Sequence, residues 1–122
     1  MKFLWTTIHV KNLEESINFY SNLVDFKVMN RFKAGNDVEI AFMGIGEENE
    51  THIELLEDKS KKDFSFGEDI SIGVKINSIE EMIEKVKLNN VPMGSPIIEV
   101  GKGRFFFVKD PNGVNVQFFE EK

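Results

Sequence analysis

The sequence predicts an α+β fold built from two βαβββ modules. The modules are expected to pair into one curved eight-stranded sheet, a half-barrel with the helices outside. Two observations carry this prediction: an internal repeat between residues 8–17 and 72–83, and the same order of strand-like and helix-like segments after each copy. Module one is predicted over 1–58, a polar linker over 59–68 and module two over 69–122.

The repeat aligns IHVKNLEESI with IGVKINSIEEMI, provided that the second copy carries a two-residue insertion. In each copy an alternating strand leads into a helix-start signal, Asn12 with Glu15 and Ser78 with Glu81. The cap side chain can accept a hydrogen bond from a helix N–H, while the acidic residue reaches back to the cap. Apolar residues then recur at helical spacing, which predicts one amphipathic helix per module.

Three strand-like segments follow each predicted helix. In module one they are FKVMNRFK, VEIAFMGI and THIELLE, and in module two PIIEV, RFFFVKD and GVNVQFFEE, with turns such as AGND, GEENE and DPNG between them. Neither half has enough apolar surface to be stable alone, so the sheets are expected to pair. Pairing would leave a concave face, which is where ligands bind.

Composition excludes several classes of function. The chain has 122 residues, enough for one domain (1–122), and its formal net charge of −6 argues against an electrostatic nucleic-acid binder. No apolar run approaches the roughly 18 residues of a membrane helix, and MKFLW turns polar too early for a signal peptide. The absence of cysteine excludes disulfides and thiolate metal sites. We therefore expect a cytoplasmic protein with no membrane partner.

Strand alternation selects the residues that face the concavity. If the helices cover the more apolar face of each sheet, the other face carries the polar residues, and His52 and Glu54 point together. The residues expected to line the cleft are Trp5, Thr7, His9, His52, Glu54, Ser71, Gly73, Lys75, Asn115, Gln117 and Phe119. Arg104, which precedes an aromatic strand, is added as a candidate contact for an anion.

Three stretches resemble a known family. HVKNLEESINFYSNLVDFKV, IELLE and FFFVKDPNGVNVQFFE resemble the vicinal oxygen chelate superfamily, which includes glyoxalase I, bleomycin resistance proteins and extradiol dioxygenases. The resemblance implies paired βαβββ modules, usually in a homodimer, with a cleft inside each half-barrel. It also implies four metal-ligand positions on strands, which fall on Trp5, Glu54, Ser71 and Gln117.

Only Glu54 suits the metal site that the resemblance implies. Trp cannot coordinate a metal, and Ser and Gln are poor neutral ligands, so no cofactor is expected. An alternative is a displaced site for Zn, Ni or Fe formed by His9, His52 and Glu54. Against it, His9 lies about 13 Å beyond the family's ligand position, at about 3.3 Å per strand residue.

The leading hypothesis is a small-molecule-binding protein of glyoxalase/bleomycin-resistance type. Trp5 and Phe119 would give the cleft an aromatic floor, and an acidic chain with Glu54 in the cleft would favour a neutral or cationic compound. The alternative is a metal-dependent isomerase or lyase of the glyoxalase I (lactoylglutathione lyase) type, with Glu54 as the catalytic base. A third hypothesis is a vestigial cleft on a domain that only contacts other proteins.

Overall fold

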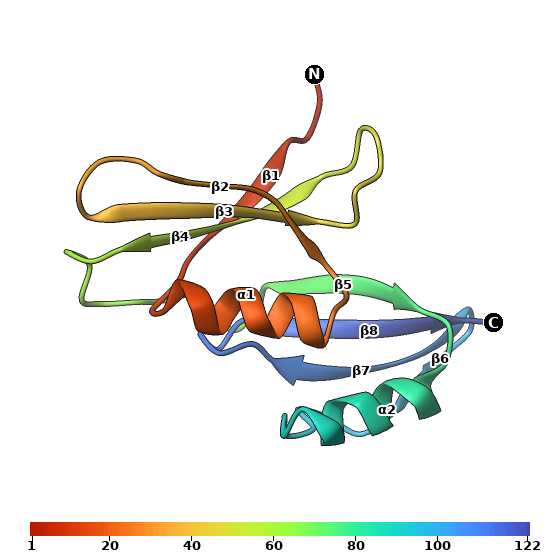
Figure 1. Cartoon of the computed structure of the whole chain (residues 1–122). Coiled ribbons are helices and arrows are strands. Elements are labelled where there is room, and N and C mark those ends of the chain that lie inside the picture. The colour runs from red at the N-terminus through yellow and green to blue at the C-terminus, as the bar shows by residue number, and fades with distance from the viewer. The chain divides into compact units, whose positions relative to one another are not determined.

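A computed structural model describes all residues from 1 to 122. The chain forms two compact units, Met1–Ser65 and Phe66–Lys122. The boundary between them along the chain falls within the predicted linker 59–68. Each unit contains one strand, one helix and then three strands (Figure 1). The α+β class and the βαβββ order of both modules are therefore confirmed, whereas the pairing of the modules into one sheet stays a prediction.

Module one is a four-stranded sheet with one helix. Its elements are β1 (Trp5–His9), α1 (Leu13–Asn22), β2 (Lys27–Lys33), β3 (Val38–Gly44) and β4 (His52–Asp58). The strand order is β1-β4-β3-β2, with β1 parallel to β4 and the other neighbours antiparallel. The parallel pair is possible because α1 supplies part of the long crossover that such a pair requires.

Module two repeats this topology. Its elements are β5 (Ser71–Ile76), α2 (Ile79–Leu88), β6 (Ile98–Val100), β7 (Gly103–Lys109) and β8 (Asn115–Glu121). The strand order is β5-β8-β7-β6, and β5 is the strand that pairs in parallel, with β8. Both helices are shorter than any helix that could cross a membrane.

Both helices begin where the capping signals predict. The Asn12 side chain accepts a hydrogen bond from the Glu15 N–H at 2.9 Å, and Ser78 Oγ accepts one from the Glu81 N–H at 3.2 Å. Each cap satisfies one of the N–H groups that a helix leaves without a partner at its start.

A second contact at each helix start comes from the last strand of the same module. The Leu13 N–H donates to Glu57 Oε2 at 3.1 Å, and the Ile79 N–H donates to Glu120 Oε2 at 2.7 Å. A carboxylate at this place is favoured because the N-terminus of a helix is electropositive. The two modules therefore fasten the helix to the sheet in the same way.

The structure corrects the alignment of the repeat. Ile8 pairs with Leu55 of β4, and Val74 pairs with Phe118 of β8. Val74 follows Ile8 by as many residues as Ser78 follows Asn12, so the two copies align without an insertion. The predicted gap arose because apolar residues alternate along both strands, so a shift of two residues matches nearly as well.

Each module has its core between the helix and the sheet. In module one α1 packs on β2, β3 and β4, and in module two α2 packs on β8. The largest fully buried side chains of the chain are Tyr20, Phe106, Phe118, Leu13, Leu23, Met43, Leu55, Ile79, Val10, Val86, Val108 and Val116. The face of each sheet opposite its helix is left to carry other side chains.

Candidate functional site

The face of the module-one sheet opposite α1 gathers the predicted site residues of that module. The register places Trp5 beside His52 and Thr7 beside Glu54, and Phe42 of β3 lies on the other side of Glu54. Side chains of paired residues point to the same face, so all five share one surface. The prediction that His52 and Glu54 point together is confirmed.

Glu54 is buried and held by a single hydroxyl. Only 9% of the residue is exposed, and its Oε1 accepts a hydrogen bond from Thr7 Oγ1 at 2.5 Å. A carboxylate at the surface of a sheet needs such a donor because burial without one is costly. The bond fixes Glu54 and occupies one of its two oxygens.

An aromatic cluster lies next to this pair. The rings of Trp5 and Phe42 meet edge-to-face with centroids 5.2 Å apart, and Phe32 stacks on Phe42 at 6.2 Å. His52 completes the cluster, with its ring 6.2 Å from that of Phe42. Trp5 is nevertheless 45% exposed, so its indole presents a large apolar surface to whatever lies above it.

His52 is held by a second glutamate, which the sequence analysis missed. His52 Nε2 lies 3.1 Å from Glu50 Oε1, and Glu50 also accepts hydrogen bonds from the N–H groups of Ile45 and Gly46 at 2.8 and 2.9 Å. Burial opposes ionisation of Glu50, but these two backbone bonds and His52 outweigh it, so the pKa of Glu50 lies below its ordinary value.

A shallow hollow of about 290 Å³ lies over this end of the sheet. It brings together aromatic, charged and imidazole side chains from the N-terminal segment, β1, β2, β3 and β4. Its lining residues are Lys2, Leu4, Trp5, Met29, Asn30, Phe42, Glu50 and His52. The hollow therefore combines an exposed indole with an oriented histidine.

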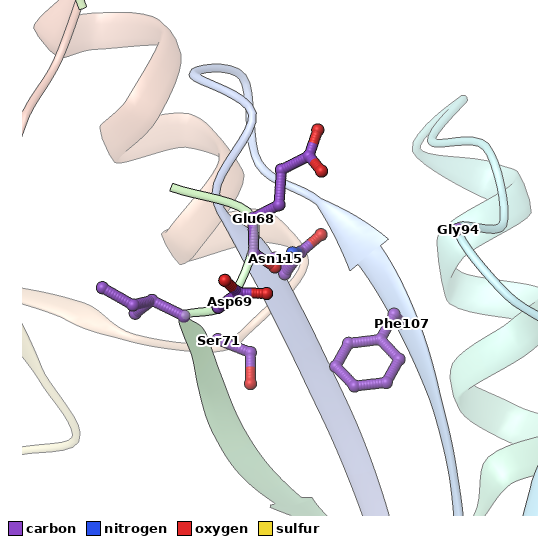
Figure 2. Close-up of a pocket in the computed structure, with 7 residues that line it drawn as sticks. Glu68, Asp69, Ser71, Gly94, Phe107 and Asn115 are labelled. Carbon is purple, nitrogen blue, oxygen red and sulfur yellow. Dashed lines mark hydrogen bonds between the residues drawn. The ribbon is translucent and has the colours of Figure 1, made fainter. Parts of the chain in front are cut away.

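Module two carries a different set of side chains on its corresponding face. The register places Ser71 beside Asn115 and Gly73 beside Gln117, and Gln117 also pairs with Phe107. A hollow of about 390 Å³ lies at one end of this face, lined by Glu68, Asp69, Ile70, Ser71, Gly94, Phe107 and Asn115. Figure 2 shows Ser71, Asn115 and Phe107 on three neighbouring strands, with the Glu68 carboxylate pointing away from them.

The two remaining predicted residues on this face of module two differ in environment. Lys75 forms an ion pair with Glu121 at 2.8 Å, and that carboxylate raises the pKa of Lys75. Phe119 lies beside Lys75 in the register and next to Phe105 of β7. The ammonium group of Lys75 is therefore paired with a carboxylate of its own module, whereas Phe119 extends the aromatic surface.

Arg104 lies on the other face of the module-two sheet. It donates from Nε to Glu120 Oε1 at 2.9 Å and from Nη2 to Glu80 Oε1 of α2 at 2.8 Å. These two hydrogen bonds raise the pKa of Arg104 and lower the pKa values of both carboxyls. The structure therefore separates Arg104 from the other candidate residues and gives it a role in fastening α2.

Arg31 does in module one what Arg104 does in module two. Its guanidinium forms ion pairs with Glu14 of α1 and, at 2.9 Å, with Glu39 of β3. The Glu39 and Glu14 hydrogen bonds raise the pKa of Arg31. Both arginines of the chain therefore tie a helix to its sheet.

The displaced metal site is not assembled. His9 pairs with Leu56 and His52 pairs with Trp5, so the two imidazoles stand at opposite ends of β1 and β4. No group of three or more His, Cys, Asp or Glu side chains in the chain is placed to hold a metal ion. The structure therefore does not bring His9, His52 and Glu54 together as one group, because the strand register separates the two histidines.

The four positions that the resemblance assigns to a metal site carry a donor set that does not fit a divalent metal. The indole N–H of Trp5 is a donor with no lone pair to offer, and the ring packs edge-on against Phe42. Ser71 and Gln117 supply only neutral oxygens, and Glu54 is the single carboxylate. Zn²⁺ and Ni²⁺ are held in proteins by several imidazole, thiolate or carboxylate ligands.

Sequence reasoning also missed the aromatic residues of these faces. Phe32, Phe42, Phe105 and Phe107 all lie opposite the helices. The prediction expects mainly polar residues on those faces, with Trp5 and Phe119 as the aromatic ones, so it does not anticipate these four phenylalanines there. In RFFFVKD three phenylalanines occur in succession, so alternation of residue type could not show which of them point away from the helix.

Comparisons with known proteins agree on one family. The family model described as Glyoxalase/Bleomycin resistance protein/Dioxygenase superfamily matches residues 2–118. A lactoylglutathione lyase from Neisseria meningitidis serogroup A is 30% identical over 128 residues, covering 100% of this chain and 92% of that protein. These matches confirm the resemblance found in the sequence.

Solved structures share the fold. Glyoxalase I of Leishmania major, described as trypanothione-dependent, matches with a TM-score of 0.85 and 25% identity, covering 99% of this chain and 87% of that one. TnmS3, an antibiotic binding protein from Streptomyces sp. CB03234, matches with a TM-score of 0.75 and 13% identity over 100% and 97% of the two chains. At 13% identity the second likeness concerns the fold alone.

Proposed function

We propose that this chain, which belongs to the Glyoxalase/Bleomycin resistance protein/Dioxygenase superfamily, binds a small planar organic molecule without a divalent metal. The binding surface is the face of module one opposite α1, centred on Trp5, Phe42 and Glu54. We further propose that the protein acts in the cytoplasm as a homodimer. The participation of Ser71, Gln117 and Phe119 of module two stays a prediction.

One observation carries the proposal: the indole of Trp5 is exposed, at a position that the family resemblance assigns to a metal ligand. Trp5 is 45% exposed, and Phe42 supports it edge-on. A flat ring held in this way offers a stacking surface with little loss of side-chain freedom on binding. The surrounding hollow of about 290 Å³ is open enough to admit a ring system.

Charge supports a neutral or cationic ligand. The chain carries a formal net charge of −6, and Glu54 lies on the same surface as the indole. A cation over an indole gains a favourable electrostatic contribution, which an anion would lose. TnmS3, described as an antibiotic binding protein, shares this fold, so the scaffold is compatible with binding of a small molecule.

The test uses the only tryptophan of the chain. A ¹⁵N-labelled sample gives a single indole N–H signal, so a titration with naphthalene-based compounds reports directly on Trp5. We expect this signal to move with saturation at ligand concentrations of about 1 mM or below, the range of weak specific binding. An indole signal that does not respond to neutral, cationic or anionic ring compounds would refute the proposal.

A second candidate function has its own support. The relative from Neisseria, at 30% identity over the whole chain, is a lactoylglutathione lyase. Glu54 is a carboxylate at one of the four metal-ligand positions that the family resemblance implies. The assay is turnover of a methylglyoxal–thiol adduct with added Ni²⁺ or Zn²⁺. Turnover that Glu54→Gln abolishes would establish this function and overturn the binding-only proposal.

A further inference from the structure

The geometry of module one points to a hydrogen-bond-accepting site at His52, oriented by Glu50, which selects ring compounds that carry a hydroxyl or N–H donor. This inference rests on the proposed function and narrows its ligand class. The hydrogen-bonding residues, His52 and Glu50, lie outside the four positions that the family resemblance assigns to metal ligands, and Trp5 enters only as the stacking surface.

Hydrogen bonds from the backbone hold Glu50 in place independently of His52. Its two oxygens accept the N–H groups of Ile45 and Gly46, which closes the loop between β3 and β4. Only 12% of its side chain is exposed, and its pKa is lowered, so it is an ionised carboxylate at neutral pH. An ionised carboxylate can only accept hydrogen bonds.

The fixed carboxylate determines which nitrogen of His52 carries the proton. His52 Nε2 lies 3.1 Å from Glu50 Oε1, so in the neutral ring the proton is on Nε2 and Nε2 donates. The lone pair is then on Nδ1. No other group of the chain makes a hydrogen bond to this ring, so Nδ1 is left as an acceptor.

The local backbone is built to allow this pair. A Cβ atom at Gly44 would lie 2.4 Å from Glu50 Oε1 and 2.6 Å from Cδ2 of His52, well inside contact distance. Glycine at this position lets both side chains lie against the end of β3. Any larger residue would displace the carboxylate, the imidazole or both.

The pair lies beside the stacking surface. His52 is paired with Trp5 in the register, and both line the hollow with Phe42. The side chain of His52 is 29% exposed, so a ligand stacked on the indole can reach the ring. A ring compound with a hydroxyl or N–H at its edge would therefore gain a hydrogen bond that a methyl ether of the same shape lacks.

The experiment compares 2-naphthol with 2-methoxynaphthalene, titrated separately into the ¹⁵N-labelled full chain while the Trp5 indole signal is followed. The wild-type protein should bind 2-naphthol about fivefold more tightly, the gain typical of one net hydrogen bond. His52→Phe should remove this preference and retain binding of the ether. His9→Phe, which changes the chain's other histidine at the far end of β1, should keep the preference.

Two measurements keep the test decisive if His52→Phe does not fold. Gly44→Ala should also remove the preference by displacing the pair, and two-bond ¹H–¹⁵N spectra should show the Nε2–H tautomer of neutral His52. An Nδ1–H tautomer, or equal affinity of the wild-type protein for both probes, would overturn the inference and leave the proposed function intact. If neither probe binds, the inference fails, and the titration with cationic and anionic ring compounds then decides whether the proposed function fails as well.

Discussion

The two modules are alike on the side of the helix and different on the opposite face. Both helices are capped at the same position. In both, the first helical N–H donates to a glutamate of the last strand, and an arginine of the sheet pairs with a glutamate of the helix. On the opposite face, the equivalent positions carry Trp5 and Ser71, Thr7 and Gly73, His52 and Asn115, and Glu54 and Gln117.

This difference separates structural from functional constraint. The contacts on the helix side maintain each module, so both copies need them. The opposite face is free to diverge, and only module one places an exposed indole beside a buried carboxylate and an oriented imidazole. The difference is the reason for assigning the binding surface to module one.

The largest effect is expected from removing the indole. Trp5→Leu should weaken binding of 2-naphthol at least about tenfold, because stacking and the buried apolar area are both lost. Phe107→Leu, on the corresponding face of module two, should weaken it much less. Binding can be followed by calorimetry, since Trp5→Leu removes the indole signal. Equal losses in the two variants would show that the modules do not differ as proposed.

The next largest effect concerns the bond between Thr7 and Glu54. Thr7→Val keeps the shape but removes the donor, and should lower the free energy of unfolding by about 1–3 kcal/mol, the cost of leaving a buried carboxylate without its partner. Gly73 occupies the equivalent position in module two. The Cβ atom that Gly73→Ala adds would lie 3.6 Å from Gln117 Oε1, an ordinary contact, so this change should lower the free energy of unfolding little. Denaturant unfolding of both variants measures the difference. Similar costs would contradict it.

A smaller effect on the free energy of unfolding is expected when the pH is lowered. The pKa of Glu120 is lowered first by Arg104 and then by the Ile79 N–H, so its stabilising contribution is present above the ordinary value of 4.5 and is lost as the pH falls through the folded-state value. Glu120→Gln should therefore be less stable than the wild type at pH 7, and the difference should shrink toward pH 3. Urea unfolding across this range checks the sign.

Glu57→Gln is the matched variant in module one. Glu57 makes the same contact with the start of its helix, but Arg31 pairs with Glu14 and Glu39 instead of with Glu57. We expect a smaller loss at pH 7 than for Glu120→Gln. A Glu120→Gln deficit that stays constant from pH 7 to pH 3 would contradict the assigned role of its ionised form.

The smallest effect on the free energy of unfolding is expected at an exposed ion pair on α2. Lys87 and Glu84 lie 3.8 Å apart on α2, and both side chains are largely exposed. Lys87→Ala should change the free energy of unfolding by less than about 0.5 kcal/mol, because exposed pairs are screened by solvent. A loss above about 1 kcal/mol in the same unfolding assay would contradict the expectation that this exposed pair contributes little.

The elements with local signals could be predicted from the sequence. Asn12 and Ser78 mark helix starts because capping depends on residues within one turn. His52 and Glu54 could be placed on one face because a strand alternates strictly. Both predictions depend only on near neighbours in the chain.

Features that depend on distant residues could not be predicted in this way. Glu50 lies in a stretch that looks like an ordinary polar turn, and its role follows from Gly44 and His52 meeting across the loop. Arg104 looked available for an anion because its partners, Glu80 and Glu120, are distant in sequence. Long-range pairing of this kind leaves no periodic signal.

The most direct test of the central claim is one titration series on ¹⁵N-labelled wild-type protein, with 2-naphthol in one arm and Zn²⁺ or Ni²⁺ in the other. Binding of an organic ligand at the exposed indole predicts that the Trp5 indole signal shifts and saturates with 2-naphthol and stays in place with stoichiometric metal. A signal that responds to one equivalent of metal and ignores the ring compound would contradict it.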